Sequence, residues 1–240
     1  MIYFFADNHY ETRAGYWLYE KISPLRNKNR LIERIRRFFK DDPAVNFPIR
    51  FFEDDISHLA GKEFLRNCSL LIINLICGTG KLEMPGNETE VILKEYCMRG
   101  RPLFLVHAGS AAFWQWDWWR KLTGLRWVRE NDPDGKEASV HPVKDFSVIP
   151  TNSSHAVIKE LKSFGLKNDE IYTKLDQTQP VDVLMETKIE EGTFPMAYVS
   201  RNQWGGKVLG FLPGHKPESF DNAELVHNVK AMIHYALEKK

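Results

Sequence analysis

The sequence predicts an α/β protein with a doubly wound, mostly parallel sheet, helices on both faces and an antiparallel extension in the C-terminal half. Short continuous apolar runs predict the parallel strands, because strands covered on both faces carry few polar residues. Helical patterns between these runs supply the crossovers that parallel strands need. Two strand-like segments joined by a glycine pair predict the antiparallel part. The chain has 240 residues and no repeat or linker, so we expect a single domain over residues 1–240.

The first half of the chain alternates predicted strands with predicted helices. The strands are the apolar runs at residues 2–6, 49–52, 70–76 and 103–106. A helix is expected around residues 31–39, where apolar residues recur at helical spacing. Another is expected at residues 88–99, and Gly100 and Pro102 after it are typical of a helix end. This alternation favours parallel strands with helical crossovers.

The second half carries less regular strand signals. Strand-like segments lie near residues 139–148 and 181–186. Two more, at 197–200 and 208–212, flank residues 201–207, where a Gly-Gly pair has the permissive backbone of a hairpin loop. We therefore expect antiparallel pairing in this part of the sheet.

Two further helices are expected in the second half. The tryptophan-rich segment 113–119 would place Trp114 and Trp118 four residues apart on one helical face. That face either packs against the core or stacks on a sugar ring. The chain ends in an amphipathic helix at about residues 218–237, with a capping side chain near its start, Ser219 or Asp221.

Charge and composition exclude several classes of partner. The 33 Lys and Arg residues balance 32 Asp and Glu, for a net charge of +1, so we expect neither nucleic acid nor a membrane surface as partner. The longest apolar run, residues 70–77, is far shorter than the roughly 20 residues of a membrane-spanning helix. The N-terminus lacks the basic leader of a secretory signal. The three cysteines show no metal-type spacing: Cys68, Cys77 and Cys97. We expect a reducing, cytoplasmic setting.

Polar side chains follow two predicted parallel strands at the points where those strands end. His107 comes directly after the fourth strand, and His215 lies in the turn after the last one. Ligands of open α/β sheets bind at the carboxyl ends of the strands, so we expect both imidazoles at one edge. A third loop adds Asp169, Glu170 and Tyr172 to the same edge.

Two imidazoles and a carboxylate suit two kinds of chemistry. His107, Glu170 and His215 can hold a divalent transition metal such as zinc, leaving an open position for water or a substrate oxygen. Without a metal, Glu170 and a histidine can act as general base and general acid, which suits proton abstraction beside a ketone. The sequence alone does not choose between them.

Ser110 offers a third alternative, because it lies on the same predicted strand-to-helix turn. Ala108-x-Ser110-x-Ala112 is a small-residue variant of the Gly-x-Ser-x-Gly nucleophile elbow, and an acidic residue and then His215 follow in the order that serine hydrolases use. Both glycines of that motif are replaced here. The other interpretation is that Ser110 only caps the helix after the turn.

Five segments of the chain carry recognisable motifs: residues 102–109, Leu122-x-Gly124 with Trp127, Ser154-His155-Ala156-Val157, Asp169-Glu170-Ile171-Tyr172, and residues 206–215. Together they resemble the ThuA-like, or trehalose-utilisation, family of the class I glutamine amidotransferase-like superfamily. The similarity spans roughly residue 70 to the C-terminus. Three departures stand out: Ala156 replaces the usual proline, Ser110 stands where a second histidine is common, and the tryptophan cluster is peculiar to this chain.

The resemblance implies a flavodoxin-like, class I glutamine amidotransferase-like fold and an enzyme that acts on a disaccharide or keto-sugar. In the amidotransferases this turn carries the nucleophilic cysteine, and the chain has His107 there, so we expect no glutaminase activity. The alternative is a non-catalytic sugar-binding or regulatory module, and a homo-oligomer is the default assembly. The expected catalytic residues are His107, Glu170 and His215, and the expected substrate-binding residues are Ser110, Trp114, Trp118, His155, Asp169 and Tyr172.

Overall fold

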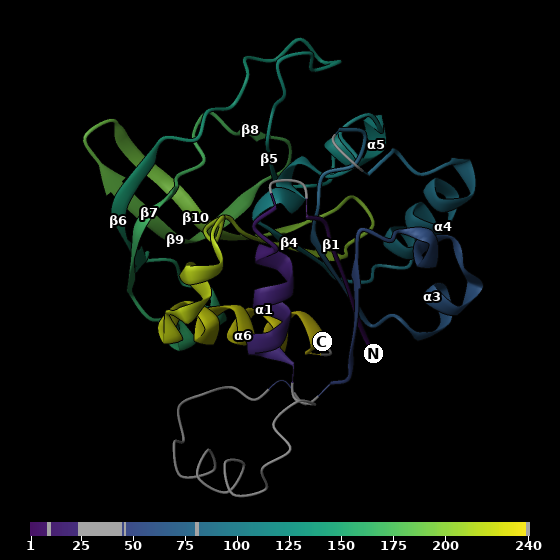
Figure 1. Ribbon diagram of the computed structural model, residues 1–240, viewed down its shortest axis with the longest axis horizontal. Helices are drawn as coiled ribbons and strands as arrows, with labels where there is room; N and C mark the ends of the chain where they lie inside the picture. The colour runs from purple at the N-terminus through teal and green to yellow at the C-terminus, as the bar shows by residue number, and fades with distance from the viewer. Residues whose placement is uncertain (9–10, 24–44, 46, 80–81, 239–240) are drawn as a thin grey trace, which may run out of the picture.

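A nine-stranded sheet forms the centre of the part of the chain that the structure describes (Figure 1). The structure is a computed structural model, and it describes residues 1–8, 11–23, 45, 47–79 and 82–238. Five of the nine strands run parallel, in the order β2-β1-β3-β4-β11, which is the strand order of a flavodoxin-like doubly wound sheet. They are β1 (Ile2–Ala6), β2 (Ile49–Glu53), β3 (Leu70–Asn74), β4 (Leu103–Val106) and β11 (Lys207–Phe211).

The remaining four strands form the antiparallel extension that the sequence predicted, in the order β10-β9-β6-β7. Asp169 and Glu170 do not lie in a loop, as the sequence indicated, because their segment pairs with β6 and ends the edge strand β7. A separate two-stranded ribbon, β5-β8, lies outside this sheet. These strands are β6 (Val143–Pro150), β7 (Phe164–Glu170), β9 (Val181–Ile189), β10 (Gly192–Arg201), β5 (Leu125–Arg126) and β8 (Asp176–Gln177).

Helices cover both faces of the sheet, as predicted. Successive side chains of β1 point to opposite faces: Ile2 and Phe4 join the core beneath α1 and α6, whereas Tyr3 and Phe5 join the core beneath α3 and α4 (Figure 1). Burial on both faces explains why β1 carries no polar residue. The helices are α1 (Ala14–Ile22), α3 (Lys62–Asn67), α4 (Asn87–Met98) and α6 (Ala223–Leu237).

The tryptophan-rich segment is not the continuous helix that the sequence predicted. Only α5 (Asp117–Arg120) is helical there, and residues 112–115 form turns. Phe113 has a left-handed φ of 47°, which a helix cannot continue through. Trp114 therefore precedes the helix and does not share an i, i+4 helical face with Trp118.

The C-terminal helix begins later than predicted, because a short 3-10 helix, η4 (Pro217–Asp221), precedes it. Its N-cap is Asn222, which accepts a hydrogen bond from the backbone N–H of Leu225 at 2.9 Å. Neither Ser219 nor Asp221 fills that role, and Ser219 donates its hydroxyl to Asp169 instead. The other 3-10 helices are η1 (Ser57–Ala60), η2 (His107–Ala111) and η3 (Ala156–Glu160).

Two further expectations concern a helix near the N-terminus and membrane-spanning helices. The helix expected around residues 31–39 lies outside the described residues. Within the described ranges, no helix combines the length and the hydropathy that a bilayer crossing requires.

Candidate functional site

The site begins at a tight turn where β4 ends. The chain passes from Val106 directly into η2, and His107 adopts a left-handed φ of 42°. Gly109 packs so closely on β3 that a Cβ there would lie 2.1 Å from the carbonyl oxygen of Ile73. A non-glycine residue such as His107 keeps a left-handed φ only when its surroundings enforce it. The packing of this turn on β3 therefore fixes where the His107 side chain can point.

The His107 imidazole is held in one tautomer. Its Nδ1 lies 2.8 Å from the carbonyl oxygen of Leu212, which can only accept a hydrogen bond, so Nδ1 carries the proton. The residue is 4% exposed, and burial lowers the pKa of His107 to about 4. His107 is thus neutral at pH 7, and the lone pair of Nε2 faces the site.

Three possible metal-donor atoms from three separate segments of the chain lie close together: His107 Nε2, His215 Nδ1 and Glu170 Oε2. The distance from His107 Nε2 to His215 Nδ1 is 3.2 Å, and Glu170 Oε2 lies 3.5 Å from His107 Nε2 and 3.4 Å from His215 Nδ1. Two ligands of a tetrahedral zinc ion lie about 3.3 Å apart, because zinc–nitrogen distances are about 2.0–2.1 Å. The three atoms form a nearly equilateral triangle, which we call the donor triangle. Its sides match the ligand–ligand distances of a tetrahedral zinc site. Within the described residues, this is the group of His, Cys, Asp and Glu side chains that could hold a metal ion.

Glu170 connects the triangle to a residue that the sequence analysis missed. Its second oxygen, Oε1, lies 3.0 Å from Nδ1 of the half-exposed His141. Burial raises the pKa of Glu170. An isolated pairing of Val140 with Thr173 brings His141 to this place, and no local sequence signal announces that pairing.

Asp169 lies beneath the site and positions it. The residue is 0% exposed, and its Oδ1 accepts hydrogen bonds from the backbone N–H groups of Glu170 at 2.7 Å and His215 at 3.1 Å. Its Oδ2 accepts the hydroxyl of Ser219 at 2.6 Å. These bonds hold the loop of His215 against the end of β7. From the sequence we expected Asp169 to bind substrate; the structure instead places it behind Glu170 and His215, two of the three ligand candidates.

Tyr172 forms one wall of the site. Its hydroxyl lies 2.9 Å from His107 Nε2, which can accept the proton because Nδ1 already carries one. Its ring packs on the rings of His107 and Trp127, each with a centroid distance of 4.6 Å. Trp127 in turn lies 5.5 Å from the His141 ring. A continuous row of rings therefore lines the site from His107 out to His141.

A second group of residues that the sequence analysis missed lies where β1 and β3 end and α1 begins. Asp7, Asn74 and Gly15 line a cavity of about 20 Å³ together with His107 and His215. Asn74 is 4% exposed, and its side-chain N–H₂ has no hydrogen-bond partner among the described residues. A cavity of this size can hold one water-sized species, since a water needs roughly 10–15 Å³. The signal in the sequence is that Asn74 interrupts the longest apolar run.

Ser110 is not placed as a nucleophile. Its hydroxyl donates to the carbonyl oxygen of His107 at 3.0 Å, and the residue is buried. The left-handed turn position that follows the strand belongs to His107. The serine-hydrolase alternative therefore lacks the exposed hydroxyl that it requires.

Trp114, Trp118 and His155 lie apart from the donor triangle. Trp118 donates its indole N–H to Glu90 at 2.8 Å and, partly buried, packs against the core beneath α4. Trp114 stacks under the guanidinium of Arg129, 5.6 Å from the ring centroid. His155 caps η3 and lines a separate cavity of about 500 Å³ with its hydrogen-bond partner Tyr235.

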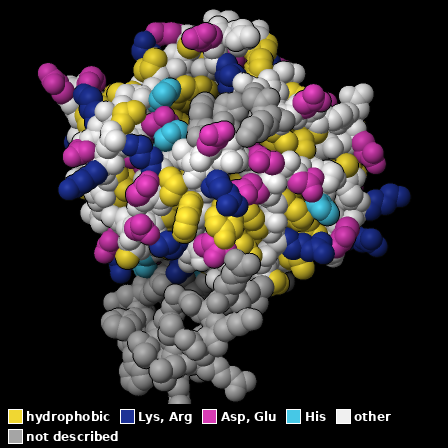
Figure 2. Space-filling model, in the orientation of Figure 1, with side chains coloured by type: hydrophobic (Ala, Val, Ile, Leu, Met, Phe, Trp, Pro, Cys, Tyr) yellow, Lys and Arg dark blue, Asp and Glu magenta, His cyan; other side chains and the backbone are white. Residues whose placement is uncertain are grey.

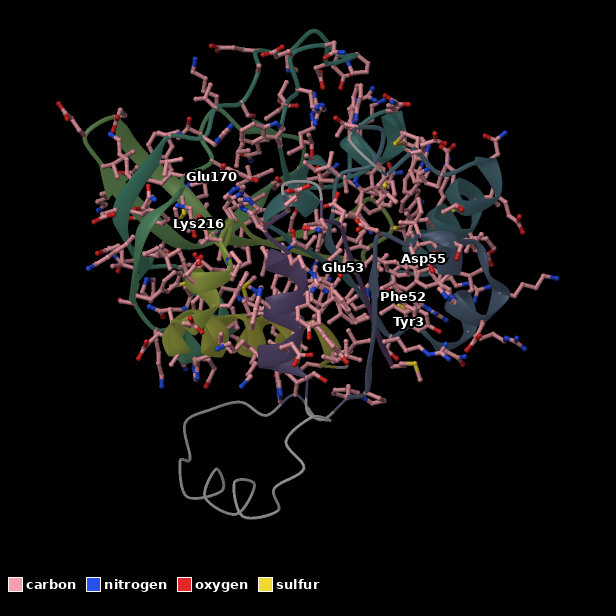
Figure 3. All side chains as sticks on the ribbon, in the orientation of Figure 1. Tyr3, Phe52, Glu53, Asp55, Glu170 and Lys216 are labelled. Carbon is pink, nitrogen blue, oxygen red and sulfur yellow. The ribbon has the colours of Figure 1, made fainter. Side chains whose placement is uncertain are left out.

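The donor triangle opens on the face shown in the figures. Figure 3 shows Glu170 at the end of β7, above the loop that carries Lys216, the residue after His215. At the corresponding place, Figure 2 shows an acidic side chain between histidines, with hydrophobic side chains beside them. The structure therefore brings His107, Glu170, His215, Asp169 and Tyr172 together at the edge where the sequence placed them.

Comparison with known proteins adds a family and a set of similar folds. A family model described as ThuA, trehalose utilisation, matches residues 25–236. A ThuA-like protein of Parabacteroides merdae is 14% identical with a TM-score of 0.68, over 98% of this chain and 88% of its own. A ThuA-like protein of Bacteroides uniformis is 16% identical with a TM-score of 0.65, over 100% and 92%. A cytoplasmic protein of Salmonella typhimurium is 10% identical with a TM-score of 0.59, over 99% and 100%. These likenesses establish the fold, and no curated protein matches the sequence.

Proposed function

Because the chain belongs to the ThuA family of trehalose utilisation, we propose that it is an enzyme that acts on a disaccharide or keto-sugar. We place the reacting centre at His107, Glu170 and His215. One observation carries the proposal: three donor atoms from three segments of the chain lie 3.2–3.5 Å apart, two of them just after the parallel strands β4 and β11 and the third at the end of β7. Converging polar groups at this edge are typical of active sites in open α/β sheets.

A divalent transition metal, with zinc as the simplest candidate, fits this set of donors. His107 is neutral at pH 7, and its Nδ1–H is already donated to a backbone carbonyl, which is how proteins usually orient a ligating histidine. Glu170 supplies one carboxylate oxygen to the triangle and keeps the other on His141. A bound metal would supply a Lewis acid that polarises a sugar hydroxyl or carbonyl oxygen.

If no metal is bound, the chain's own residues would supply the proton chemistry instead. Burial raises the pKa of Glu170, which brings this carboxylate closer to the range in which it can both accept and release a proton. Proton abstraction from the carbon beside a ketone suits such a base. Tyr172 is positioned to donate a hydrogen bond at the same place, because its hydroxyl already lies 2.9 Å from His107 Nε2.

The test is product analysis of trehalose, sucrose and their keto derivatives by NMR and mass spectrometry. We expect His107→Ala and His215→Ala to abolish turnover without loss of the folded state, which circular dichroism would monitor. His155→Ala is the matched control, because this histidine lines a separate cavity. Full activity in both site variants would exclude this reacting centre.

A non-catalytic sugar-binding module is the alternative function. The hydrogen bond between Tyr172 and His107 Nε2 favours it, because that bond occupies the lone pair that a catalyst would use. Calorimetry separates the two functions, since a binding module releases heat with a sugar that stays chemically unchanged. The cysteine that glutaminase chemistry requires is replaced by His107, so we expect no ammonia from glutamine.

A further inference from the structure

A small cavity borders both the donor triangle and the ends of β1 and β3, and we call it the Asn74 cavity. Asn74 of β3 and Asp7, the residue after β1, line it together with His107 and His215. Its volume is about 20 Å³, which holds one water-sized species, since a water needs roughly 10–15 Å³. Because two of the lining residues belong to the donor triangle, an occupant of this cavity lies beside the proposed reacting centre.

Asn74 lines this cavity with a side-chain N–H₂ that is buried and unpaired. It is the last residue of β3 and is 4% exposed, and within the described residues its Nδ2 makes no hydrogen bond. Folded proteins leave few buried polar groups unpaired, and each such group needs an explanation, such as a catalytic role or a bound water. An unpaired amide that lines a cavity of this size therefore indicates a small hydrogen-bond acceptor as its partner.

Small neighbours keep the space beside the amide open. In the register of β1 and β3, Asn74 lies opposite Ala6. Gly15 of α1 also lines the cavity, and a Cβ on Gly15 would lie 3.5 Å from Asn74 Nδ2 and 2.3 Å from the Cβ of Ala6. The start of α1 can approach β1 this closely only because Gly15 has no side chain. A larger residue at this position would displace α1 or fill the space beside the amide.

The lining favours a neutral occupant that both accepts and donates hydrogen bonds. The N–H₂ of Asn74 can only donate. Asp7 presents a carboxylate, whose Oδ2 accepts the backbone N–H of Ile76 at 2.6 Å and which has further lone pairs. The negative charge of this carboxylate disfavours an anion in the same small cavity. Water meets both requirements, and the Thr12 hydroxyl adds a third polar partner.

We propose that Asn74 is a positioning residue of the reacting centre and that its side-chain N–H₂ donates a hydrogen bond to one water molecule in the Asn74 cavity, beside His107 and His215. The inference rests on the proposed function, which makes these two histidines part of the reacting centre. A catalytic zinc ion with three protein ligands takes a water at its fourth position. With a metal bound, Asn74 would hold that water through its N–H₂.

The first test is a crystal structure of the metal-free full chain, which needs neither a metal nor a substrate. We expect one ordered water at about 2.7–3.2 Å from Asn74 Nδ2 in the wild type, and no water at that place in Asn74→Leu. Leucine has nearly the size of asparagine but lacks the donor. A wild-type cavity without an ordered water would overturn the inference, even if Asn74→Leu did not fold.

The second test uses cobalt(II) as the probe, because its visible absorption spectrum reports the ligands and the geometry around the ion. Asn74→Leu should change the spectrum of the cobalt-loaded protein, since the variant alters the water ligand and leaves both histidines in place. Circular dichroism would monitor the folded state. A spectrum of Asn74→Leu identical to that of the wild type would contradict the role of Asn74.

Asn202→Leu is the matched control for the cobalt experiment. Asn202 is also 4% exposed, and its side-chain N–H₂ likewise has no partner among the residues that the structure describes. It lies in the loop before β11, at the opposite end of that strand from His215. Asn202→Leu should therefore leave the spectrum unchanged, and equal changes in the two variants would also overturn the inference.

Failure of this inference is distinguishable from failure of the proposed function. Wild-type protein that binds cobalt and transforms a sugar, but has no ordered water in the Asn74 cavity, keeps the reacting centre and removes Asn74 from it. An ordered water that Asn74→Leu abolishes, in a protein that shows neither metal binding nor turnover, supports the water site and removes the enzymatic function.

Discussion

Replacement of Asp169 by alanine tests how the site is held together. The buried carboxylate accepts hydrogen bonds from Ser219 Oγ, Glu170 N and His215 N, at 2.6, 2.7 and 3.1 Å. A hydrogen bond to a charged group contributes about 1.5–3 kcal/mol, and such contributions within one network do not add fully. Alanine leaves three buried donors without an acceptor. We therefore expect the free energy of unfolding to fall by about 3–5 kcal/mol, because each donor left unpaired costs about 1–3 kcal/mol and the costs within one network do not add fully.

Two further variants should destabilise the protein less than Asp169→Ala does. Asp169→Asn keeps one acceptor oxygen for the two backbone N–H groups, and the Ser219 hydroxyl can rotate to accept from the new amide, so we expect a loss of about 1–2 kcal/mol. Ser219→Ala removes one of the three bonds and should destabilise by about 1.5–3 kcal/mol.

Urea-induced unfolding at pH 7 measures these changes, and zinc titration measures their effect on the site. Because Asp169 holds the backbone of His215, Asp169→Ala should also weaken zinc binding about 10–100-fold, as loss of supporting residues does at metal sites. Destabilisation by Asp169→Ala of less than about 1 kcal/mol would refute the assigned role of this carboxylate.

Two other predictions concern the turn and the acid stability of the fold. Gly109→Ala places a Cβ 2.1 Å from the carbonyl oxygen of Ile73, so we expect the free energy of unfolding, measured in urea, to fall by about 3 kcal/mol. Gly86→Ala is the control: a Cβ there meets nothing within 4 Å, and the free energy of unfolding should fall by less than about 1 kcal/mol. Hydrogen bonds from Arg120 hold the pKa of Asp134 below its ordinary value of 3.8, so this contribution to stability is complete above that value and is lost as the pH falls through the lower folded pKa. Urea unfolding between pH 3 and pH 7 should show a smaller loss at acid pH in Asp134→Asn, and an unchanged profile would contradict the assignment.

The sequence predicted the meeting of His107 and His215 for a physical reason. Each follows a parallel strand, and the carboxyl ends of parallel strands necessarily share one edge of the sheet. Asn74 also carried a signal, as a polar residue inside an otherwise apolar run. His141 carried none, because it reaches Glu170 through a pairing of Val140 with Thr173, distant in the sequence.

Other expectations failed because burial and strand pairing depend on distant segments. The segment that ends in Glu170 is polar enough to suggest a loop, yet it forms the edge strand β7 against β6. Trp118 packs, partly buried, against the core beneath α4, and no local pattern distinguishes such a packing face from a ligand-binding face. His155 is part of a segment that resembles a family motif, and the fold places it beside Tyr235 in a separate cavity.

The measurement that tests the central proposal most directly is the metal content of untagged protein purified without chelator and then supplied with zinc, manganese or nickel. We expect about one equivalent of a transition metal per chain, lost in both His107→Ala and His215→Ala and retained in His155→Ala. Wild-type protein without bound metal, or site variants that keep it, would contradict the donor triangle as a metal centre.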